Sequence, residues 1–221
     1  MTISLSDAGK RFNRDWIFRH LTFNFEAGQS YAITGPNGSG KSTLLQVLSG
    51  AMQVSEGNLQ YTGKGQIPVA TGTKDNNQNG EQSFNGDNIY QHVSICAPYL
   101  EVVEEMSLIE FLLFHQNFKP LLPGISLEKI ILLLGLEKTA KKQIRYFSSG
   151  MKQRVKLAQC IFSDTSIVLL DEPCTNLDLD GIHLYHRLID EYCKDRLVIV
   201  SSNDEVEYRF CKHRMSIMDY K

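Results

Sequence analysis

The sequence contains no apolar run that approaches the ~20 residues needed to cross a bilayer. Its longest candidate, at residues 130–136, has the length of part of a soluble helix. The N-terminal segment also lacks the apolar run of about 7–15 residues that a secretory signal requires. These absences predict a chain that is neither exported nor inserted into a membrane.

An excess of one charge sign is also absent, because 23 lysines and arginines face 25 aspartates and glutamates. The chain therefore has no global positive field to attract nucleic acid or anionic lipid. Basic side chains do gather around one segment, at Lys141, Lys142, Arg145, Lys152, Arg154 and Lys156. Two aromatic residues, Tyr146 and Phe147, are too few for a base-stacking platform. We therefore interpret this segment as a solvated helical face and expect no nucleic-acid partner.

The sequence also lacks a disulfide framework and a metal-binding motif. Its five cysteines are scattered, odd in number and never spaced as Cys-x-x-Cys. This pattern favours a reducing compartment and argues against structural zinc. Hydrophobic residues make up 42% of the 221-residue chain, so a core of ordinary size can form without either kind of crosslink.

The N-terminal part combines strand patterns with one glycine-rich turn. Residues 2–5 and 21–25 alternate polar and apolar side chains, which predicts a small antiparallel sheet. An apolar run at 29–34 leads into a glycine loop and a helical pattern at 42–48. Residues 63–88 contain five glycines and five asparagines, which predicts a long surface loop.

The rest of the chain predicts helices followed by buried strands. One helix is expected at about 104–118, and a second after Ser126, which suits an N-cap, with Gly135 ending it. The runs at 167–170 and 197–200 are too short for helices, and their β-branched residues and leucines indicate parallel strands buried on both faces. The sequence therefore predicts an α/β fold.

The strongest chemical motif lies between the strand predicted at 29–34 and the helix predicted at 42–48. It fits the phosphate-binding pattern G-x-x-x-x-G-K-[ST] and comprises Gly35, Pro36, Asn37, Gly38, Ser39, Gly40, Lys41, Ser42 and Thr43. Backbone N–H groups of such a loop converge on phosphate oxygens, and the helix N-terminus adds partial positive charge. We expect Lys41 to reach the terminal phosphates and the Ser42 hydroxyl to bind Mg²⁺.

Two consecutive carboxylates, Asp171 and Glu172, follow the apolar strand at 167–170. Ligands of open α/β sheets bind at this carboxyl end of the strands. Adjacent carboxylates need a cation, so we expect Asp171 to hold Mg²⁺ through water and Glu172 to polarise the water that attacks the γ-phosphate. The pair predicts hydrolysis of a bound nucleoside triphosphate.

The stretch Phe-Ser-Ser-Gly-Met-Lys-Gln-Arg, which begins at Phe147, resembles the signature motif of the ATP-binding cassette (ABC) ATPases. Ser148 and Gly150 match that motif, whereas Phe147, Ser149 and Met151 stand where the family commonly has Leu, Gly and Gln. The resemblance covers essentially the whole chain. The Asn-Lys-x-Asp motif that reads guanine in other phosphate-loop families is absent.

The resemblance implies a P-loop NTPase core of the ABC ATPase type, with an antiparallel β subdomain and an inserted helical subdomain. It implies a single ABC ATP-binding domain over residues 1–221. Within it, 1–96 and 164–221 form the nucleotide-binding core, and 97–163 form the helical subdomain with the signature motif. The stretch Asn-Leu-Asp at 176–178 is similar to the D-loop of the family.

The resemblance also implies ligands and partners. ATP with Mg²⁺ is expected, and Phe12 stands where the family places an aromatic residue that stacks on adenine; a core position is the alternative. In the family, Ser148 and Gly150 of one subunit bind the γ-phosphate held by the other subunit. We therefore expect a homodimer, or a heterodimer with a related cassette, in which the active sites are shared.

Two positions depart from the family pattern. Ala97 stands where the family usually has a glutamine that helps to ligate Mg²⁺, and a methyl group cannot coordinate a cation. Gln91 is the nearest glutamine, but it is expected too early, within the strand. Asn203 replaces a histidine that contacts the γ-phosphate, and asparagine donates a hydrogen bond without positive charge. Because Glu172 remains, we expect slow hydrolysis rather than an inactive site.

Together these features predict the ATP-binding and ATP-hydrolysing subunit of an ABC transporter, held at the cytoplasmic face of a membrane by a separate transmembrane permease. The segment 97–105 is expected to meet a permease helix, with Glu104 and Glu105 suited to a basic helix end. Two alternatives stay open: a soluble ABC-type ATPase that acts as a mechanical switch, and a regulatory subunit whose hydrolysis is vestigial.

Overall fold

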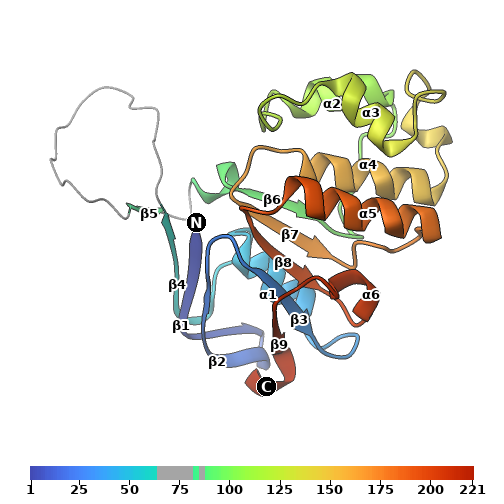
Figure 1. Ribbon diagram of the computed structural model, residues 1–221. Helices are drawn as coiled ribbons and strands as arrows, with labels where there is room; N and C mark the ends of the chain where they lie inside the picture. Colours follow the sequence, from blue (N-terminus) through green and yellow to red (C-terminus); the bar gives the residue numbers. More distant parts are fainter. Residues whose placement is uncertain (64–81, 85–87) are drawn as a thin grey trace, which may run out of the picture.

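The computed structural model describes residues 1–63, 82–84 and 88–221. Figure 1 shows two sheets, with helices on either side of the larger one and the strand β1 at the N-terminus. The elements follow in chain order as β1 (Thr2–Phe12), β2 (Asp15–Phe25), β3 (Ser30–Thr34), α1 (Lys41–Leu48), β4 (Glu56–Gly63), β5 (Gln82–Phe84), η1 (Ile89–Gln91), β6 (Val93–Cys96), α2 (Leu108–His115), α3 (Leu127–Leu134), η2 (Ile144–Tyr146), α4 (Ser149–Ile161), β7 (Ile167–Asp171), α5 (Leu179–Tyr192), β8 (Leu197–Ser201), α6 (Glu205–Tyr208), β9 (His213–Ser216) and η3 (Ile217–Tyr220).

The larger sheet has five strands in the order β6-β7-β8-β3-β9, and every neighbouring pair is parallel. All residues of β7 and β8 are buried, as their short apolar sequences predicted. Successive side chains of these strands point to opposite faces, so Val168 and Leu170 enter one core while Ile167 and Leu169 enter the other. The predicted α/β class and the phosphate-loop NTPase fold are confirmed.

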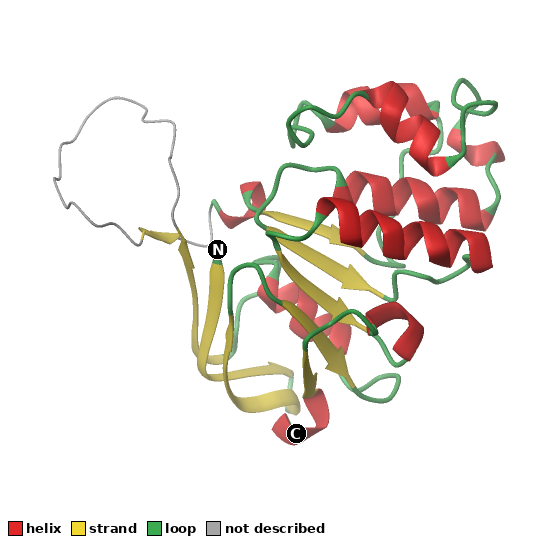
Figure 2. Cartoon of the chain, in the orientation of Figure 1, coloured by secondary structure: helices red, strands yellow, loops and turns green. Residues whose placement is uncertain are grey.

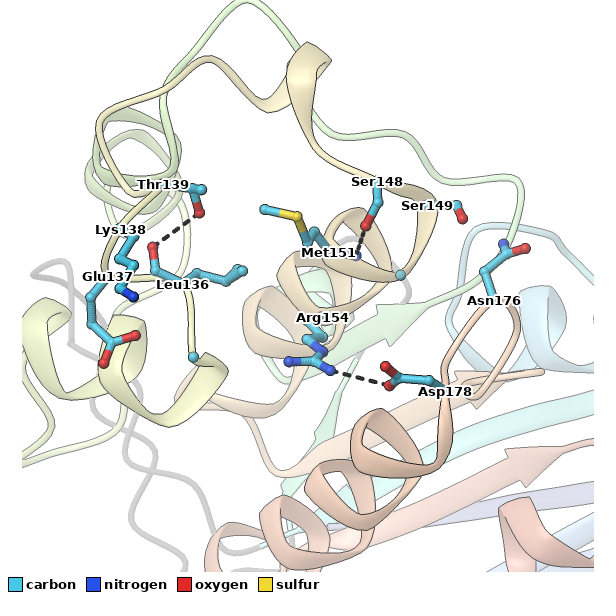
Figure 3. Close-up of a pocket in the computed structure, with 12 residues that line it drawn as sticks. Leu136, Glu137, Lys138, Thr139, Ser148, Ser149, Met151, Arg154, Asn176 and Asp178 are labelled. Carbon is cyan, nitrogen blue, oxygen red and sulfur yellow. Dashed lines mark hydrogen bonds and ion pairs between the residues drawn. The ribbon is translucent and has the colours of Figure 1, made fainter.

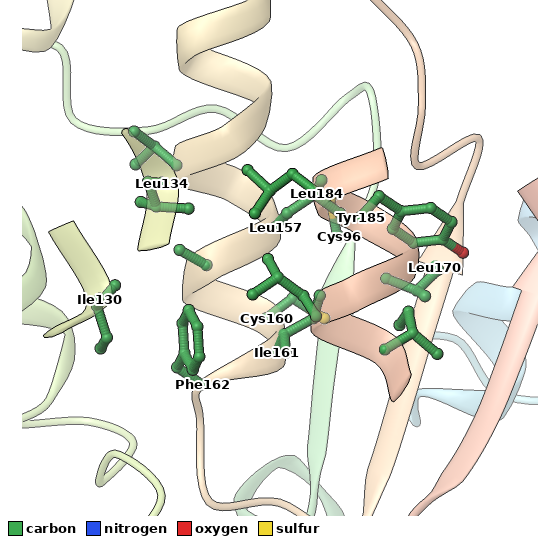
Figure 4. Packing of buried hydrophobic residues seen from close by; sticks show 14 of the residues in the cluster. Cys96, Ile130, Leu134, Leu157, Cys160, Ile161, Phe162, Leu170, Leu184 and Tyr185 are labelled. Atoms are coloured by element: carbon green, nitrogen blue, oxygen red, sulfur yellow. The ribbon is translucent and has the colours of Figure 1, made fainter. Parts of the chain in front are cut away.

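The two cores lie on opposite faces of this sheet. On one face, α4 and α5 pack side by side over the strands, and Figure 4 shows Leu157 of α4 next to Leu184 and Tyr185 of α5. On the other face, α1 contributes Leu44 and Leu45 to a core shared with β1 and β2. The helix α1 is therefore held between the two sheets.

The smaller sheet is antiparallel, with the order β2-β1-β4-β5. It confirms the strands predicted at 2–5 and 21–25, and both extend further than predicted. The prediction of a loop over 63–88 is wrong at β5, which pairs with β4 because backbone hydrogen bonding there outweighs a weak local strand pattern. The rest of that predicted loop, 64–81 and 85–87, lies outside the described residues.

The helical section is shown at the upper right of Figure 2. The helix predicted at 104–118 is shorter, because Ser107 caps α2 in a capping box with Glu110. The second helix is confirmed: Ser126 caps α3, and Gly135 ends it in a left-handed conformation. Across the described ranges, no helix has the length and apolar character that spanning a bilayer demands. The division of the chain at 97 and 163 stays a prediction.

Candidate functional site

The glycine loop joins the carboxyl end of β3 to the first residue of α1. Lys41 is 5% exposed, and its Nζ donates to the carbonyl oxygens of Gly35 at 2.7 Å and of Pro36 at 3.2 Å. The N-terminus of α1 carries no side-chain cap, whereas a serine or aspartate side chain caps each of α2, α3, α4, α5 and α6. Uncapped amides at a helix N-terminus form an anion-binding site.

The loop also contains a buried polar atom without a partner. The hydroxyl oxygen of Ser39 is buried and has no hydrogen-bond partner in the described structure. A Cβ placed on Gly35 would lie 2.9 Å from that oxygen, so the hydroxyl faces the inside of the loop bend. An orphaned buried hydroxyl costs free energy unless a ligand satisfies it. This observation fits a phosphate held within the loop.

Parallel strands bring three loops together at one sheet edge. Asp171 at the end of β7 is aligned with Ser201 at the end of β8, and Ser201 is aligned with Ile33 of β3. The Ser201 hydroxyl donates to Oδ1 of Asp171 at 2.7 Å, and Asp171 is 2% exposed. No sequence motif indicates this role of Ser201, which depends on strand register alone.

The loop after β8 contacts the glycine loop directly. Asn203 Nδ2 donates to Oδ1 of Asn37 at 2.9 Å. A cavity of about 400 Å³, named here the carboxylate cavity, is lined by Asn37, Glu172, Asn203 and Glu207 among others. The structure therefore brings the phosphate loop, the acidic strand end and Asn203 to one place, as the motifs predicted.

Glu172 adopts a backbone conformation that is rare for a side-chain-bearing residue. Its φ is 43°, in the left-handed region. Its N–H donates to the Ser201 carbonyl at 2.9 Å, and its own carbonyl accepts from the Thr175 hydroxyl at 2.9 Å. Such strain persists only where surrounding contacts hold it, and it clusters at functional sites.

The residues that could hold a magnesium ion are few. Ser42 lies in the first turn of α1, and the Asp171 carboxylate is oriented by Ser201. Across the described ranges there is no group of three or more His, Cys, Asp or Glu side chains arranged to hold a metal. A hydroxyl and one carboxylate nevertheless fit Mg²⁺, which keeps several waters and takes further oxygens from substrate phosphates.

The signature residues line a different cavity, of about 710 Å³, which we call the signature cavity (Figure 3). The Ser148 hydroxyl caps α4 by accepting from the Met151 amide, and Gly150 lies in the first turn. Arg154 pairs with Asp178 at 3.2 Å on the same wall. This cavity shares no lining residue with the carboxylate cavity. One chain therefore presents two separate half-sites.

Phe12 ends β1 and is 45% exposed, so the alternative of a core position is excluded. The Lys10 ammonium lies 5.4 Å from its ring centroid and also donates to the Gln53 carbonyl. An exposed ring on the smaller sheet is available for stacking.

The two departures have clear structural settings. Ala97 follows β6 and is fully buried. The prediction that Gln91 lies within this strand is wrong: Gln91 ends the short helix η1, whose first residue, Ile89, is buried in the core. Gln91 thus precedes the amino end of β6, whereas Asp171 lies at the carboxyl end of the neighbouring strand β7. Gln91 therefore cannot replace the missing glutamine.

Glu104 and Glu105 both form ion pairs within the chain. Glu104 pairs with Lys152 at 2.5 Å, and Glu105 with Arg145 at 3.1 Å. Both carboxylate side chains remain partly exposed, Glu104 at 43% and Glu105 at 70%, and exposed ion pairs are weak, so the contact with a basic helix end stays a prediction. The segment just before them also exposes apolar side chains, Tyr99, Leu100 and Val103.

A parallel sheet with a phosphate-binding loop after β3 and paired carboxylates after β7 defines a nucleoside-triphosphatase of the phosphate-loop class. The family model described as ABC transporter matches residues 18–175. The cytochrome c biogenesis ATP-binding export protein CcmA of Xanthomonas axonopodis pv. citri is 32% identical over 182 residues, which cover 82% of this chain and 77% of that protein.

Two further comparisons agree with this match. ABC transporter A family member 11 of Dictyostelium discoideum is 27% identical over 90% of this chain, which spans only 22% of that longer protein. The dimeric post-hydrolysis structure of the ATP-binding cassette MJ0796 bound to ADP and Pi is 19% identical, covers 97% of this chain and 93% of its own, and has a TM-score of 0.74. The chain therefore belongs to the ABC transporter family, as one of its ATP-binding, ATP-hydrolysing cassettes.

Proposed function

We propose that the chain hydrolyses Mg-ATP between two cassettes and thereby energises transport through a separate membrane subunit. The observation that carries this proposal is the separation of the two half-sites. Ser148 and Gly150 line the signature cavity, whereas Glu172 lines the carboxylate cavity; the two share no lining residue, and the segment 174–178 lies between them. A head-to-tail pair of cassettes would place the signature residues of one against the phosphate loop of the other.

In this proposal the glycine loop holds the phosphates through its amides, and Lys41 exchanges its bonds to the loop carbonyls for bonds to phosphate oxygens. Ser42 and Asp171 hold Mg²⁺, which neutralises charge on the phosphates. The Phe12 ring stacks on adenine. Asn203 donates to the γ-phosphate with the amide that otherwise bonds Asn37.

Glu172 has the central chemical role in this proposal. Its carboxylate orients the attacking water, and the strained turn around it fixes where that carboxylate points. Asn203 supplies no positive charge, and Ala97 supplies no ligand for the metal. These two departures slow turnover without removing the group that acts on the water.

The membrane subunit meets the cassette at the segment before α2 in this proposal. Tyr99, Leu100 and Val103 are exposed there, and a helix of the permease with an apolar face would bury them. The chain then works at the cytoplasmic face of the membrane.

Leu100→Asp is expected to release the chain from the membranes of the cells that make it. Leu132→Asp, on the exposed face of α3, is the control and should leave it bound.

The hydrolytic role is tested with Glu172→Gln. We expect a kcat at least about a hundredfold below wild type, because the acid–base group is lost. Equal, background-level rates for the two proteins would instead favour the regulatory alternative.

The shared site is tested by mixing two inactive variants. Glu172→Gln retains an intact signature, and Ser148→Asp retains an intact Glu172. A mixed pair contains one complete site, so mixing should restore ATPase activity that neither variant has alone. Absence of any recovery would contradict the composite site.

A further inference from the structure

One peptide group, between Pro173 and Cys174, is held from both sides by buried side chains. Gln153 Nε2 donates to the Pro173 carbonyl at 2.7 Å, and Glu207 Oε1 accepts from the Cys174 N–H at 2.7 Å. Gln153 is 4% exposed and Glu207 is 5% exposed. Because the carbonyl and the N–H belong to one planar unit, the two bonds together fix the orientation of a rigid group.

The two side chains come from different elements. Gln153 lies on α4, three residues beyond Gly150. Glu207 lies on α6, which follows Asn203, and the buried Tyr185 hydroxyl fixes α6 by donating to the Glu207 carbonyl at 2.8 Å. The peptide that they hold therefore connects the signature helix with the loop that touches Asn37.

This peptide also determines how Glu172 is presented. On its amino side Glu172 is held by the bond to Ser201. On its carboxyl side the next residue is Pro173, which has no N–H, so Cys174 N is the first amide that can hold the turn. The contact between Glu207 and Cys174 is thus the first restraint on a backbone N–H after the strained residue, and it adds to the bonds that the Glu172 and Pro173 carbonyls accept.

The burial of Glu207 argues against a purely space-filling role. Its second carboxylate oxygen is buried and has no partner among the described residues. Burying an incompletely bonded carboxyl costs free energy, and an apolar side chain would avoid that cost. Glu207 also lines the carboxylate cavity together with Glu172.

We infer that Gln153 and Glu207 are positioning residues that hold the Pro173–Cys174 peptide and so set the position of the Glu172 carboxylate. A shift of α4, when its signature end engages a nucleotide on the partner cassette, moves this peptide through Gln153. The inference rests on the proposed function, in which Glu172 orients the attacking water.

The kinetic test compares four variants of the full chain. Glu207→Ala and Gln153→Met each remove one bond and should lower kcat by about tenfold to a hundredfold, the cost of a misplaced reacting group, with KM for ATP little changed. Glu207→Gln keeps an acceptor oxygen and should recover most of kcat. Glu205→Ala, on the same helix, removes only an exposed ion pair with Arg214 and should behave as wild type.

A second measurement keeps the inference separate from the proposed function. Amide hydrogen exchange at Cys174, followed by NMR, should be faster in Glu207→Ala than in wild type or Glu205→Ala. Unchanged exchange would overturn the restraint, and faster exchange with unchanged kcat would overturn its role in hydrolysis. A wild-type rate equal to that of Glu172→Gln would overturn the proposed function instead. If Glu207→Ala does not fold, Gln153→Met tests the same peptide without altering α6.

Discussion

Gly40 connects the phosphate loop to the smaller sheet, and its replacement by alanine should be severely destabilising. Its φ of 96° is a left-handed conformation that costs an alanine about 1–2 kcal/mol. A Cβ at Gly40 would also lie 2.3 Å from Cγ2 of Ile17, far inside van der Waals contact. Overpacking of this kind adds about 1–3 kcal/mol. We therefore expect Gly40→Ala to lower the free energy of unfolding by about 2–5 kcal/mol.

The chain offers a matched control in the same loop. Gly38 has a φ of 76°, but a Cβ there would meet nothing within 4 Å. Gly38→Ala should therefore cost only the backbone part, about 1–2 kcal/mol. Adding Ile17→Ala to Gly40→Ala removes the clashing methyl group. The double variant should therefore lose less stability than the sum of the losses in Gly40→Ala and Ile17→Ala. Such recovery is a coupling energy between the two positions.

Urea unfolding of wild type, the three single variants and the double variant, monitored by circular dichroism, measures these free energies. The reasoning is refuted if Gly40→Ala costs no more than Gly38→Ala, or if Ile17→Ala adds its full cost to the double variant. Equilibrium binding of a fluorescent ATP analogue should follow the same order, because a displaced Gly40 moves the amides at the start of α1.

Two further predictions concern the carboxylate cavity. Asn203→His should raise kcat about fivefold near neutral pH, because a hydrogen bond from a charged donor is stronger than one from a neutral donor by ~1 kcal/mol. Steady-state ATPase assays measure this, and no gain in kcat would refute it. Burial raises the pKa of Glu207 above its ordinary value, so the folded chain favours the protonated form, and stability is lost as pH rises through that pKa. Glu207→Gln should therefore have a higher Tm than wild type at about pH 8, with the difference shrinking toward about pH 4.5. A difference that grows on acidification would contradict the sign.

The local motifs could be predicted from the sequence because they depend on backbone chemistry. The phosphate loop requires glycines and a lysine between a strand and a helix, and the structure has that order. The caps at Ser126 and Gly135 were likewise predictable, because capping is a contact between neighbours in the chain.

Strands β4 and β9 were not predicted, since each is defined by hydrogen bonds to distant strands. β9 is an edge strand of four residues that pairs with β3, and its local pattern is weak. The same limitation applies to the ion pairs of Glu104 and Glu105, which the sequence did not indicate. Their cations lie some forty residues or more further along the chain, as the pairs Arg145–Glu105 and Lys152–Glu104 show.

The sequence by itself determined the fold class, the phosphate loop and the acidic strand end, because each follows from residue type and close spacing. Only the tertiary structure decided which groups meet. Strand register aligned Asp171 with Ser201, and helix packing placed Gln153 and Glu207 on one peptide beside Glu172. Such contacts join residues far apart in the chain, and their distances are set by packing of the whole core rather than by local preference.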